Sequence, residues 1–245
     1  MRVSIIIAIY NSHKIVVRQM RHFKKMDLPK DVEIIFVDDG SNPPLNYNNG
    51  MRNFQIIPTK EKRAWTQGLA RNLGADHATG RFLLFTDIDH ILTKEAIEAV
   101  HSFTGDKMVF RRKFGIFDRH GNILSDKFTL EAFGANPKYR RRKFYAGVHG
   151  NTYAVLRTTF YEMKGFDSKY CEEEFHVGGA WMSEERHLNR CYNSRVAKGQ
   201  SPPAAGGPDI YVYPIGKFHK DGVGNPGGLF HDLSRVQGEK LPNKQ

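Results

Sequence analysis

The stretch Phe82-Leu83-Leu84-Phe85-Thr86-Asp87-Ile88-Asp89-His90 decides the fold. Its apolar run is typical of a buried strand, and the two carboxylates one residue apart mark where that strand reaches solvent. We therefore expect Asp87 and Asp89 to emerge on the same side, at the edge of a crevice. Carboxylate pairs hold Mg²⁺ or Mn²⁺ together with the phosphates of a substrate. The stretch predicts a site for a nucleotide diphosphate.

A second interpretation of the same carboxylates is structural. Asp89 or Thr93 is suited to cap a helix that runs from about Lys94 to Phe103. The two interpretations are compatible, because a strand end can hold a metal and lead into a helix.

The first hundred residues alternate short apolar runs with amphipathic stretches, which favours βαβ units and a mainly parallel sheet with helices on both faces. Ligands of such sheets bind beyond the carboxyl ends of the strands, so Tyr10-Asn11, Asp38-Asp39 and Asp87–Asp89 should lie together. The expected strands are 3–9, 33–37, 53–57 and 81–86, and the expected helices are 12–25 (with Ser12 as N-cap), 66–77 and 94–103.

Length and composition indicate one α/β domain over 1–245. Its opening apolar run is too short for a signal peptide, no segment is long enough to span a membrane, and two cysteines form no disulfide scaffold, so we expect a cytoplasmic protein. Residues 195–209 are rich in Pro and Gly, and we expect them to form no regular element and to act as a lid or a linker. Residues 221–245 are expected to form a C-terminal tail.

Four motifs occur in a shared order: residues 3–11, Val37-Asp38-Asp39-Gly40-Ser41, Ala70-Arg71-Asn72-Leu73-Gly74-Ala75 with Gly80, and Thr86–Asp89. Their sequence and spacing resemble the family-2-type inverting glycosyltransferases of the GT-A fold, with Ala8 where that family usually has proline. A weaker fifth match is Met163-Lys164-Gly165-Phe166-Asp167.

The resemblance implies that residues 1–104 bind a nucleotide sugar, most simply a UDP-sugar, and that residues 105–220 face the acceptor. Asp38 and Asp39 can accept hydrogen bonds from a uracil-type base and from ribose, and Tyr10 can stack on the base. Arg71 either reaches the base or diphosphate as a fixed cation or lies on a solvated face. The implied donor-binding residues are Ala8, Tyr10, Asn11, Asp38, Asp39, Arg71, Asp87 and Ile88.

The resemblance also implies a divalent cation, Mn²⁺ or Mg²⁺, and a general base. The metal ligands would be Asp87, Asp89 and a histidine beyond the sheet, with His219 the first candidate and His231 the second. In Ser183-Glu184-Glu185-Arg186, Glu185 stands where the family has its catalytic Asp. The longer side chain leaves the base open between Glu185 and Glu184. Both are also typical of the first turn of a helix, where the dipole favours acidic residues.

The excess of positive charge indicates what kind of acceptor the protein uses. The formal net charge is +11, and residues 107–143 hold eleven Lys and Arg against three Asp and Glu, interleaved with aromatic residues. Such a segment suits a polyanion, with Arg111, Arg112, Arg140, Arg141 and Arg142 as candidate contacts. The acceptor is then a saccharide, a lipid carrier, or a hydroxylated base in DNA, as in viral enzymes that glycosylate modified pyrimidines. A solvated basic face accounts for the same charges.

Two other classes remain. One is a nucleic-acid-binding protein that keeps this fold without catalysis, and the other is a nucleotidyltransferase. The second is disfavoured because the first strand leads into Ala8-Ile9-Tyr10-Asn11, which lacks a glycine-rich loop with a phosphate-binding lysine. The sequence alone leaves the sugar and the oligomeric state open.

Overall fold

A computed structural model describes residues 2–47, 50–62, 66–117, 120–126, 145–171 and 183–212. The strands are β1 (Val3–Ile9), β2 (Val32–Asp38), β3 (Phe54–Pro58), β4 (Phe82–Asp87), β5 (His90–Ile91), β6 (Lys107–Phe114), β7 (Ile116–Phe117), β8 (Ile123–Leu124), β9 (Tyr145–Leu156) and β10 (Ala205–Val212). The helices are α1 (His13–Lys25), α2 (Gln67–His77), α3 (Lys94–Ser102), α5 (Arg157–Glu162) and α6 (Ser183–Ala197), with a 3₁₀ turn, η2, at Ser168–Cys171.

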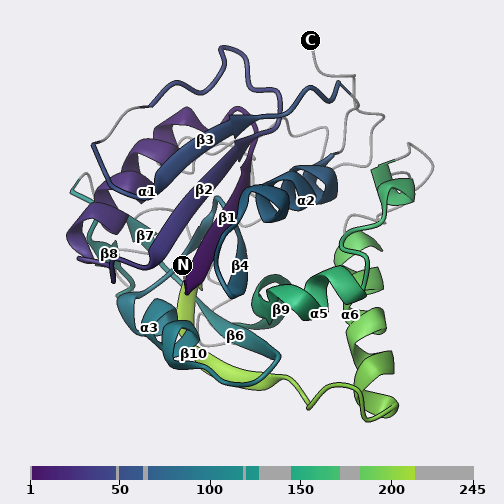
Figure 1. The fold of residues 1–245 in the computed structure, drawn as a ribbon. Helices are drawn as coiled ribbons and strands as arrows, with labels where there is room; N and C mark the ends of the chain where they lie inside the picture. The colour runs from purple at the N-terminus through teal and green to yellow at the C-terminus, as the bar shows by residue number, and fades with distance from the viewer. Residues whose placement is uncertain are drawn as a thin grey trace, which may run out of the picture.

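Eight strands form one sheet in the order β3-β2-β1-β4-β9-β6-β10-β5, and β7 pairs with β8 separately. The strands β3, β2, β1 and β4 are parallel, and so are β6 and β10. The strand β9 runs antiparallel between β4 and β6, which makes the sheet mixed. Both halves of the chain thus build a single sheet (Figure 1). Its parallel part carries the first two motifs and the fourth, Thr86–Asp89, which we call the metal motif because its carboxylates are the expected metal ligands.

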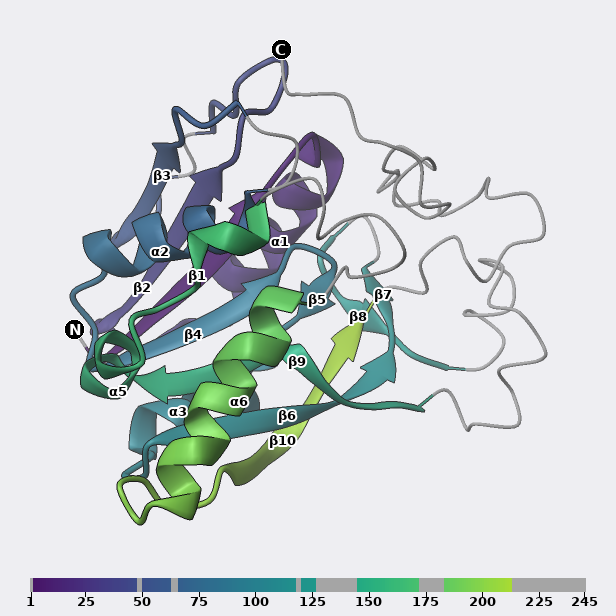
Figure 2. The same cartoon turned by 90° about the vertical axis from the view of Figure 1, so that its right-hand side faces the viewer.

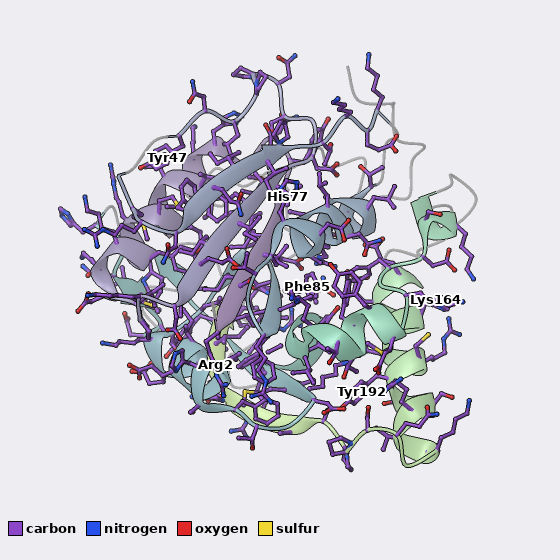
Figure 3. The ribbon with its side chains drawn as sticks, in the orientation of Figure 1. Arg2, Tyr47, His77, Phe85, Lys164 and Tyr192 are labelled. Carbon is purple, nitrogen blue, oxygen red and sulfur yellow. The ribbon has the colours of Figure 1, made fainter. Side chains whose placement is uncertain are left out.

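The sheet is covered on both faces, as expected. Alternate residues of β1 and β2 pack against α1 and α3 on one face, in a core that includes Ile5, Phe36 and Ile97. Their neighbours in sequence pack against α2, α5 and α6 on the other face, where Phe85 contacts Tyr153, Phe160 and Phe166. Phe85 lies in the interior between these elements (Figure 3). A strand buried on both sides explains why the apolar runs are continuous.

The expected elements of the first hundred residues are confirmed to within one residue at each end. Of the two candidate caps for α3, Asp89 and Thr93, the structure shows Thr93. Its side chain accepts a hydrogen bond from the Ala96 N–H. Ser12 precedes α1, but its hydroxyl donates to the Tyr10 carbonyl at 2.8 Å and makes no cap.

The expectation that 195–209 holds no regular element is wrong. The helix α6 continues to Ala197, and Ala205 begins β10, which pairs in parallel with β6. The pairing shifts register between Gly206 and Asp209, and a bulge of this kind accommodates Pro208. A Cβ on Gly207 would lie 2.7 Å from the Phe110 ring, so a small residue is needed there. The composition that suggested a loop is the composition of a bulged strand.

No helix among the described residues is long and apolar enough to cross a membrane. Cys191 is a free thiol on α6.

Candidate active site

A buried arginine lies at the centre of the site. The guanidinium of Arg71, from α2, is fully buried and donates through Nη1 to Glu185 Oε1 at 2.5 Å and through Nη2 to Asp87 Oδ1. Burial alone disfavours the charge, but Asp87, Glu185 and Glu184 outweigh it and raise the pKa of Arg71. A charge taken out of water persists only when it is paired in this way. Of the two roles expected for Arg71, the solvated face is excluded.

Two further side chains fix Asp87. Gln67 donates to its Oδ1 at 2.8 Å and Asn151 donates to its Oδ2 at 2.6 Å. The sequence analysis missed both residues. Gln67 begins α2 and Asn151 lies in the middle of β9, and neither position carries a motif that would mark it.

The metal motif gathers three ligand atoms. The side chains of Asp87, Asp89 and His90 offer oxygen or nitrogen atoms that all lie within 4.8 Å of one another. Gln19 of α1 holds this turn by donating to the carbonyls of Ile88 and His90, at 3.0 and 2.7 Å. The two carboxylates form a donor pair that fits Mn²⁺ or Mg²⁺, and the imidazole lies beside them. His90 was missed although it directly follows Asp89, because the sequence shows no reason for its side chain to turn back toward the aspartates.

The two candidate bases, Glu184 and Glu185, open α6 and are both buried. Burial raises the pKa of Glu184 to about 8, with the charge of Glu185 adding to the effect. Burial also raises the pKa of Glu185, against the opposing effect of Arg71. Glu185 faces Arg71 and Asp87, whereas a Cβ on Gly68 would lie 2.6 Å from Glu184 Oε2. Glu185 is therefore the carboxylate on the side of the metal motif.

The position of α6 depends on a buried lysine. Lys107, at the start of β6, donates to Asn189 Oδ1 of α6 at 2.5 Å and lies over the rings of Tyr153 and Tyr192, 4.8 and 4.9 Å from their centroids. Burial lowers the pKa of Lys107 to about 8. Figure 2 shows α6 lying along the part of the sheet formed by β9 and β6. These contacts seat the helix that presents Glu185.

Asn72, the neighbour of Arg71, binds the turn that the fifth motif predicted. Its side chain donates to the Phe166 carbonyl at 2.8 Å and accepts the Phe166 N–H at 3.0 Å. Gly165 has φ = 65°, which favours glycine, and the Phe166 ring lies 5.5 Å from the Arg71 guanidinium carbon. The third motif thus contacts both α6, through Arg71, and this turn, through Asn72.

The residues predicted to bind the nucleotide mostly make contacts within the protein. Asp38 accepts the N–H groups of Ser41 and Leu45 at 3.0 and 2.7 Å, and Asp39 accepts the hydroxyl of Thr66 at 2.8 Å. Asn11 has φ = 48° and its Oδ1 accepts the Asn42 N–H. Ala8 and Tyr10 lie at and just beyond the end of β1, and Ile88 lies in the metal turn. Their contact with a nucleotide stays a prediction.

The predicted acceptor residues separate into three groups. Arg111 and Lys113 both pair with Asp209, at 3.3 and 2.7 Å. Arg112 contacts His90 beside the metal motif. Burial lowers its pKa, an effect that Asp89 and Asp87 oppose. The remaining predicted residues, Arg140, Arg141 and Arg142, lie outside the described residues, as do His219 and His231.

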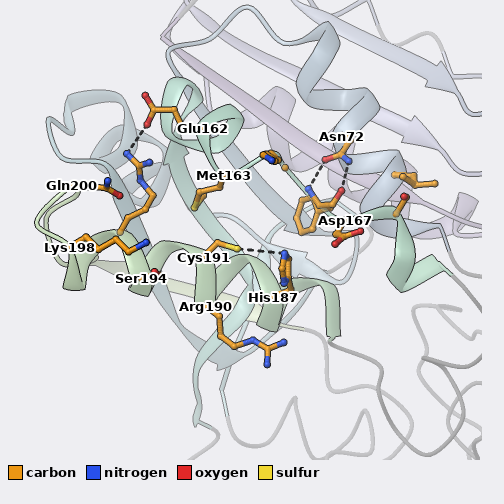
Figure 4. Close-up of a pocket in the computed structure, with 16 residues that line it drawn as sticks. Asn72, Glu162, Met163, Asp167, His187, Arg190, Cys191, Ser194, Lys198 and Gln200 are labelled. Atoms are coloured by element: carbon orange, nitrogen blue, oxygen red, sulfur yellow. Dashed lines mark hydrogen bonds and ion pairs between the residues drawn. The ribbon is translucent and has the colours of Figure 1, made fainter.

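A separate groove of about 940 Å³ lies between α6 and the turn that follows α5 (Figure 4). On its walls, Arg195 pairs with Glu162 at 2.6 Å, and His187 Nε2 lies 3.5 Å from Cys191 Sγ. Three cations that line it make no side-chain ion pair within the described ranges: Lys164, Arg190 and Lys198. The groove therefore presents a basic surface on one side of α6.

The sequence profile described as glycosyl transferase family 2 matches residues 4–182. The chain belongs to this family. The match covers every motif discussed above except the two glutamates of α6, which begin just after it.

Relatives agree with this assignment. The chain is 30% identical over 109 residues to the poly(ribitol-phosphate) beta-N-acetylglucosaminyltransferase TarS of Staphylococcus aureus, covering 42% of this chain and 19% of TarS. It is 23% identical over 182 residues to a GalNAc(5)-diNAcBac-PP-undecaprenol beta-1,3-glucosyltransferase of Campylobacter jejuni, covering 71% of this chain and 57% of that protein. The chain therefore spans less than two thirds of the length of either relative.

Solved structures show the same GT-A fold. A structure of S. aureus TarS in complex with UDP-GlcNAc superposes with a TM-score of 0.54 at 18% identity, covering 87% of this chain and 58% of that one. The mannosyltransferase PcManGT of Pyrobaculum calidifontis, in complex with GDP-Man and Mn²⁺, gives a TM-score of 0.50 at 18% identity, covering 86% and 56%.

The raised pKa of Glu184 predicts a pH-dependent stability. The folded state keeps the proton up to about pH 8, whereas the unfolded chain releases it near 4.5, the ordinary pKa of a glutamate. The folded state therefore binds more protons between these values, and the free energy of unfolding should fall as pH rises, by up to about 1 kcal/mol per pH unit. Urea unfolding of Glu184→Gln between pH 5.5 and 7.5 should show a flatter dependence than the wild type. The exposed Glu98→Gln is the control, and an unchanged slope in Glu184→Gln would refute the prediction.

Proposed function

We propose that this protein is an inverting, metal-dependent glycosyltransferase that uses a nucleotide-sugar donor, most simply a UDP-sugar. The observation that carries the proposal is the single guanidinium of Arg71, which contacts both a carboxylate of the metal motif and the carboxylate expected to act as base. This arrangement would bring a diphosphate site and a proton acceptor to the same place. Family membership and the UDP-GlcNAc complex of TarS support the donor class.

Each group has a role in a single displacement. Asp87 and Asp89, with His90 beside them, would hold the divalent cation, which supplies Lewis-acid stabilisation of the diphosphate. Glu185 takes the proton of the acceptor hydroxyl as its oxygen forms the bond to the anomeric carbon and the diphosphate leaves from the opposite face. Because the hydroxyl attacks from the face opposite the leaving diphosphate, the anomeric centre is inverted. Burial raises the pKa of Glu185, and Arg71 opposes that rise while its hydrogen bond holds the carboxyl group in place.

For the compartment, we propose the cytoplasm on the ground of one cysteine. We place the reaction in the cytoplasm, because Cys191 is a free thiol in the described part of the chain and reducing compartments preserve such thiols.

Donor binding is tested with Asp89→Asn. In the wild type, UDP with Mn²⁺ at 100 times its dissociation constant should stabilise the fold by about 2.7 kcal/mol. The variant should lose this stabilisation and keep its melting temperature without ligand. Asp89 is a cleaner target than Asp87, because Asp87 also pairs with Arg71. Asp76→Asn, at the exposed end of α2, is the control, and full Mn²⁺-dependent stabilisation of Asp89→Asn would remove that residue from the site.

The base is tested with Glu185→Gln. Glutamine can still accept the Arg71 hydrogen bond, so the fold and the affinity for UDP should be preserved. Turnover should fall by at least about a hundredfold, since a general base contributes 10² to 10⁴. Glu184→Gln should have a smaller effect on steady-state transfer. The reverse order would assign the base to Glu184, and two near-normal variants would leave the mechanism without its base.

For the acceptor, we propose a polyanion. Net charge and the basic segment 107–143 support this, and TarS is named for a poly(ribitol-phosphate) acceptor. The structure narrows the candidates within that segment, because Arg111 is already paired and Arg112 lies at the metal motif. A phosphodiester polymer and DNA with hydroxylated bases share the chemistry that this surface would recognise.

Replacing Arg140, Arg141 and Arg142 by Ala should weaken polyanion binding and flatten its log–log salt dependence by up to about three. A matched control removes the same charge from the groove beside α6, with Lys164, Arg190 and Lys198 replaced by Ala. Transfer to a ribitol-phosphate polymer, to hydroxymethylated DNA and to a neutral oligosaccharide is then compared. Preferred transfer to the neutral saccharide would refute the polyanion, and an effect confined to the control would move the acceptor surface to the groove.

A further inference from the structure

Arg112 differs from its two neighbours on β6. Successive side chains of a strand project to opposite faces. Arg111 and Lys113 agree with this rule, since both reach Asp209 of β10, with Arg111 59% exposed and Lys113 47% exposed. Arg112 projects the other way and contacts His90 beside the metal motif. One basic run thus supplies two surfaces, and only Arg112 belongs to the site.

The hydrogen bonds of Arg112 fix the state of His90. The guanidinium can only donate, so the 3.0 Å contact between Arg112 Nη1 and His90 Nε2 requires an unprotonated Nε2. The proton of the neutral ring is then on Nδ1, which donates to Thr152 Oγ1. Both ring nitrogens are thus engaged, so Asp87 and Asp89 are left as the ligands for a cation and His90 serves Arg112. Thr152 in turn lies 2.9 Å from Thr86 Oγ1 on β4. Arg112 is therefore held in one orientation by a chain of buried groups that ends on the central strand.

The guanidinium still lacks an acceptor. Its Nε is buried and makes no hydrogen bond within the described ranges, where Arg112 also forms no ion pair. Asp87 and Asp89 lie close enough to act on its charge without a direct contact. A buried N–H with no acceptor is costly in a folded protein and is expected where a ligand supplies the missing oxygen. Arg112 lies beside a motif that suits a divalent cation. A diphosphate is a ligand that both the guanidinium and such a metal ion can bind.

We propose that Arg112 binds the diphosphate of the nucleotide-sugar donor, next to the divalent cation, and that His90 positions it there. The proposal rests on the donor class proposed above. The sequence analysis placed Arg112 on the acceptor surface, whereas this proposal assigns it to the donor site. The planar fork of the guanidinium matches two phosphate oxygens, so lysine is expected to be an incomplete substitute.

The test measures affinity for UDP and for uridine, each by calorimetry or NMR titration, in Arg112→Ala, Arg112→Lys and Arg111→Ala. Arg112→Ala should bind UDP about tenfold to a hundredfold more weakly, which is the usual loss when a charged hydrogen bond is removed. Its affinity for uridine, which lacks phosphate, should stay within about twofold of the wild type. Arg112→Lys should fall between the wild type and Arg112→Ala. Arg111→Ala removes the same charge from the opposite face of β6 and should bind UDP normally.

Three outcomes are decisive. Normal UDP binding by Arg112→Ala would overturn the proposal while leaving the glycosyltransferase function standing, because the wild type would still bind UDP. Equal losses for UDP and uridine would also overturn it, since they would indicate a distorted site. Failure of the wild type to bind UDP would refute the UDP-sugar donor itself. Mn²⁺ binding without nucleotide, followed by electron paramagnetic resonance, should be retained in Arg112→Ala and would show that the metal ligands are intact.

Discussion

The site depends on one buried cation that serves two carboxylates from distant parts of the chain. Asp87 comes from the end of a central strand and Glu185 from the first turn of α6, and Arg71 contacts both. Without that guanidinium, the buried Glu185 and the partly buried Asp87 would face each other with no cation between them, in surroundings that penalise a charge. The turn of Asp87 and Asp89 and the proposed base, Glu185, therefore cannot be placed independently. Their geometry is set by the position of α2 on the sheet.

The side chains around Arg71 fix α2 and α6 relative to each other and to the sheet. Asn72 binds both backbone groups of Phe166, and the Phe166 ring covers Arg71. On the other side, Lys107 ties α6 to the sheet through Asn189 and the two tyrosine rings. Polar groups buried among aromatic residues are specific because each has few acceptable partners. Side-chain contacts thus join α2 and α6 to the sheet around Arg71.

The sequence predicted the parallel half of the sheet well because its strands are buried on both faces and its helices have a clear apolar stripe. It failed for β10, where Gly206, Gly207 and Pro208 fit a bulge that only the packing against Phe110 explains. Within the site, the carboxylates were recognisable because they follow strand ends. Gln67, Asn151 and His90 were missed, because an amide or imidazole gains its role from partners far away in the chain. Asp38 is the opposite case. Its carboxylate is easy to recognise in the sequence, but in the structure it accepts two backbone N–H groups of its own loop.

The bridge from Arg71 to Glu185 limits how this protein can exchange parts with its relatives. A chimera that joined residues 1–117 of this chain to the later half of another family member would separate Arg71 from Glu185 and Asn72 from Phe166. Each pair spans more than ninety residues of sequence, so no single crossover point after α2 and before the Phe166 turn keeps both halves native. Recombination that preserves the bridge must carry α2, the Phe166 turn and the start of α6 together. These three segments therefore form one structural unit although they are far apart in the sequence.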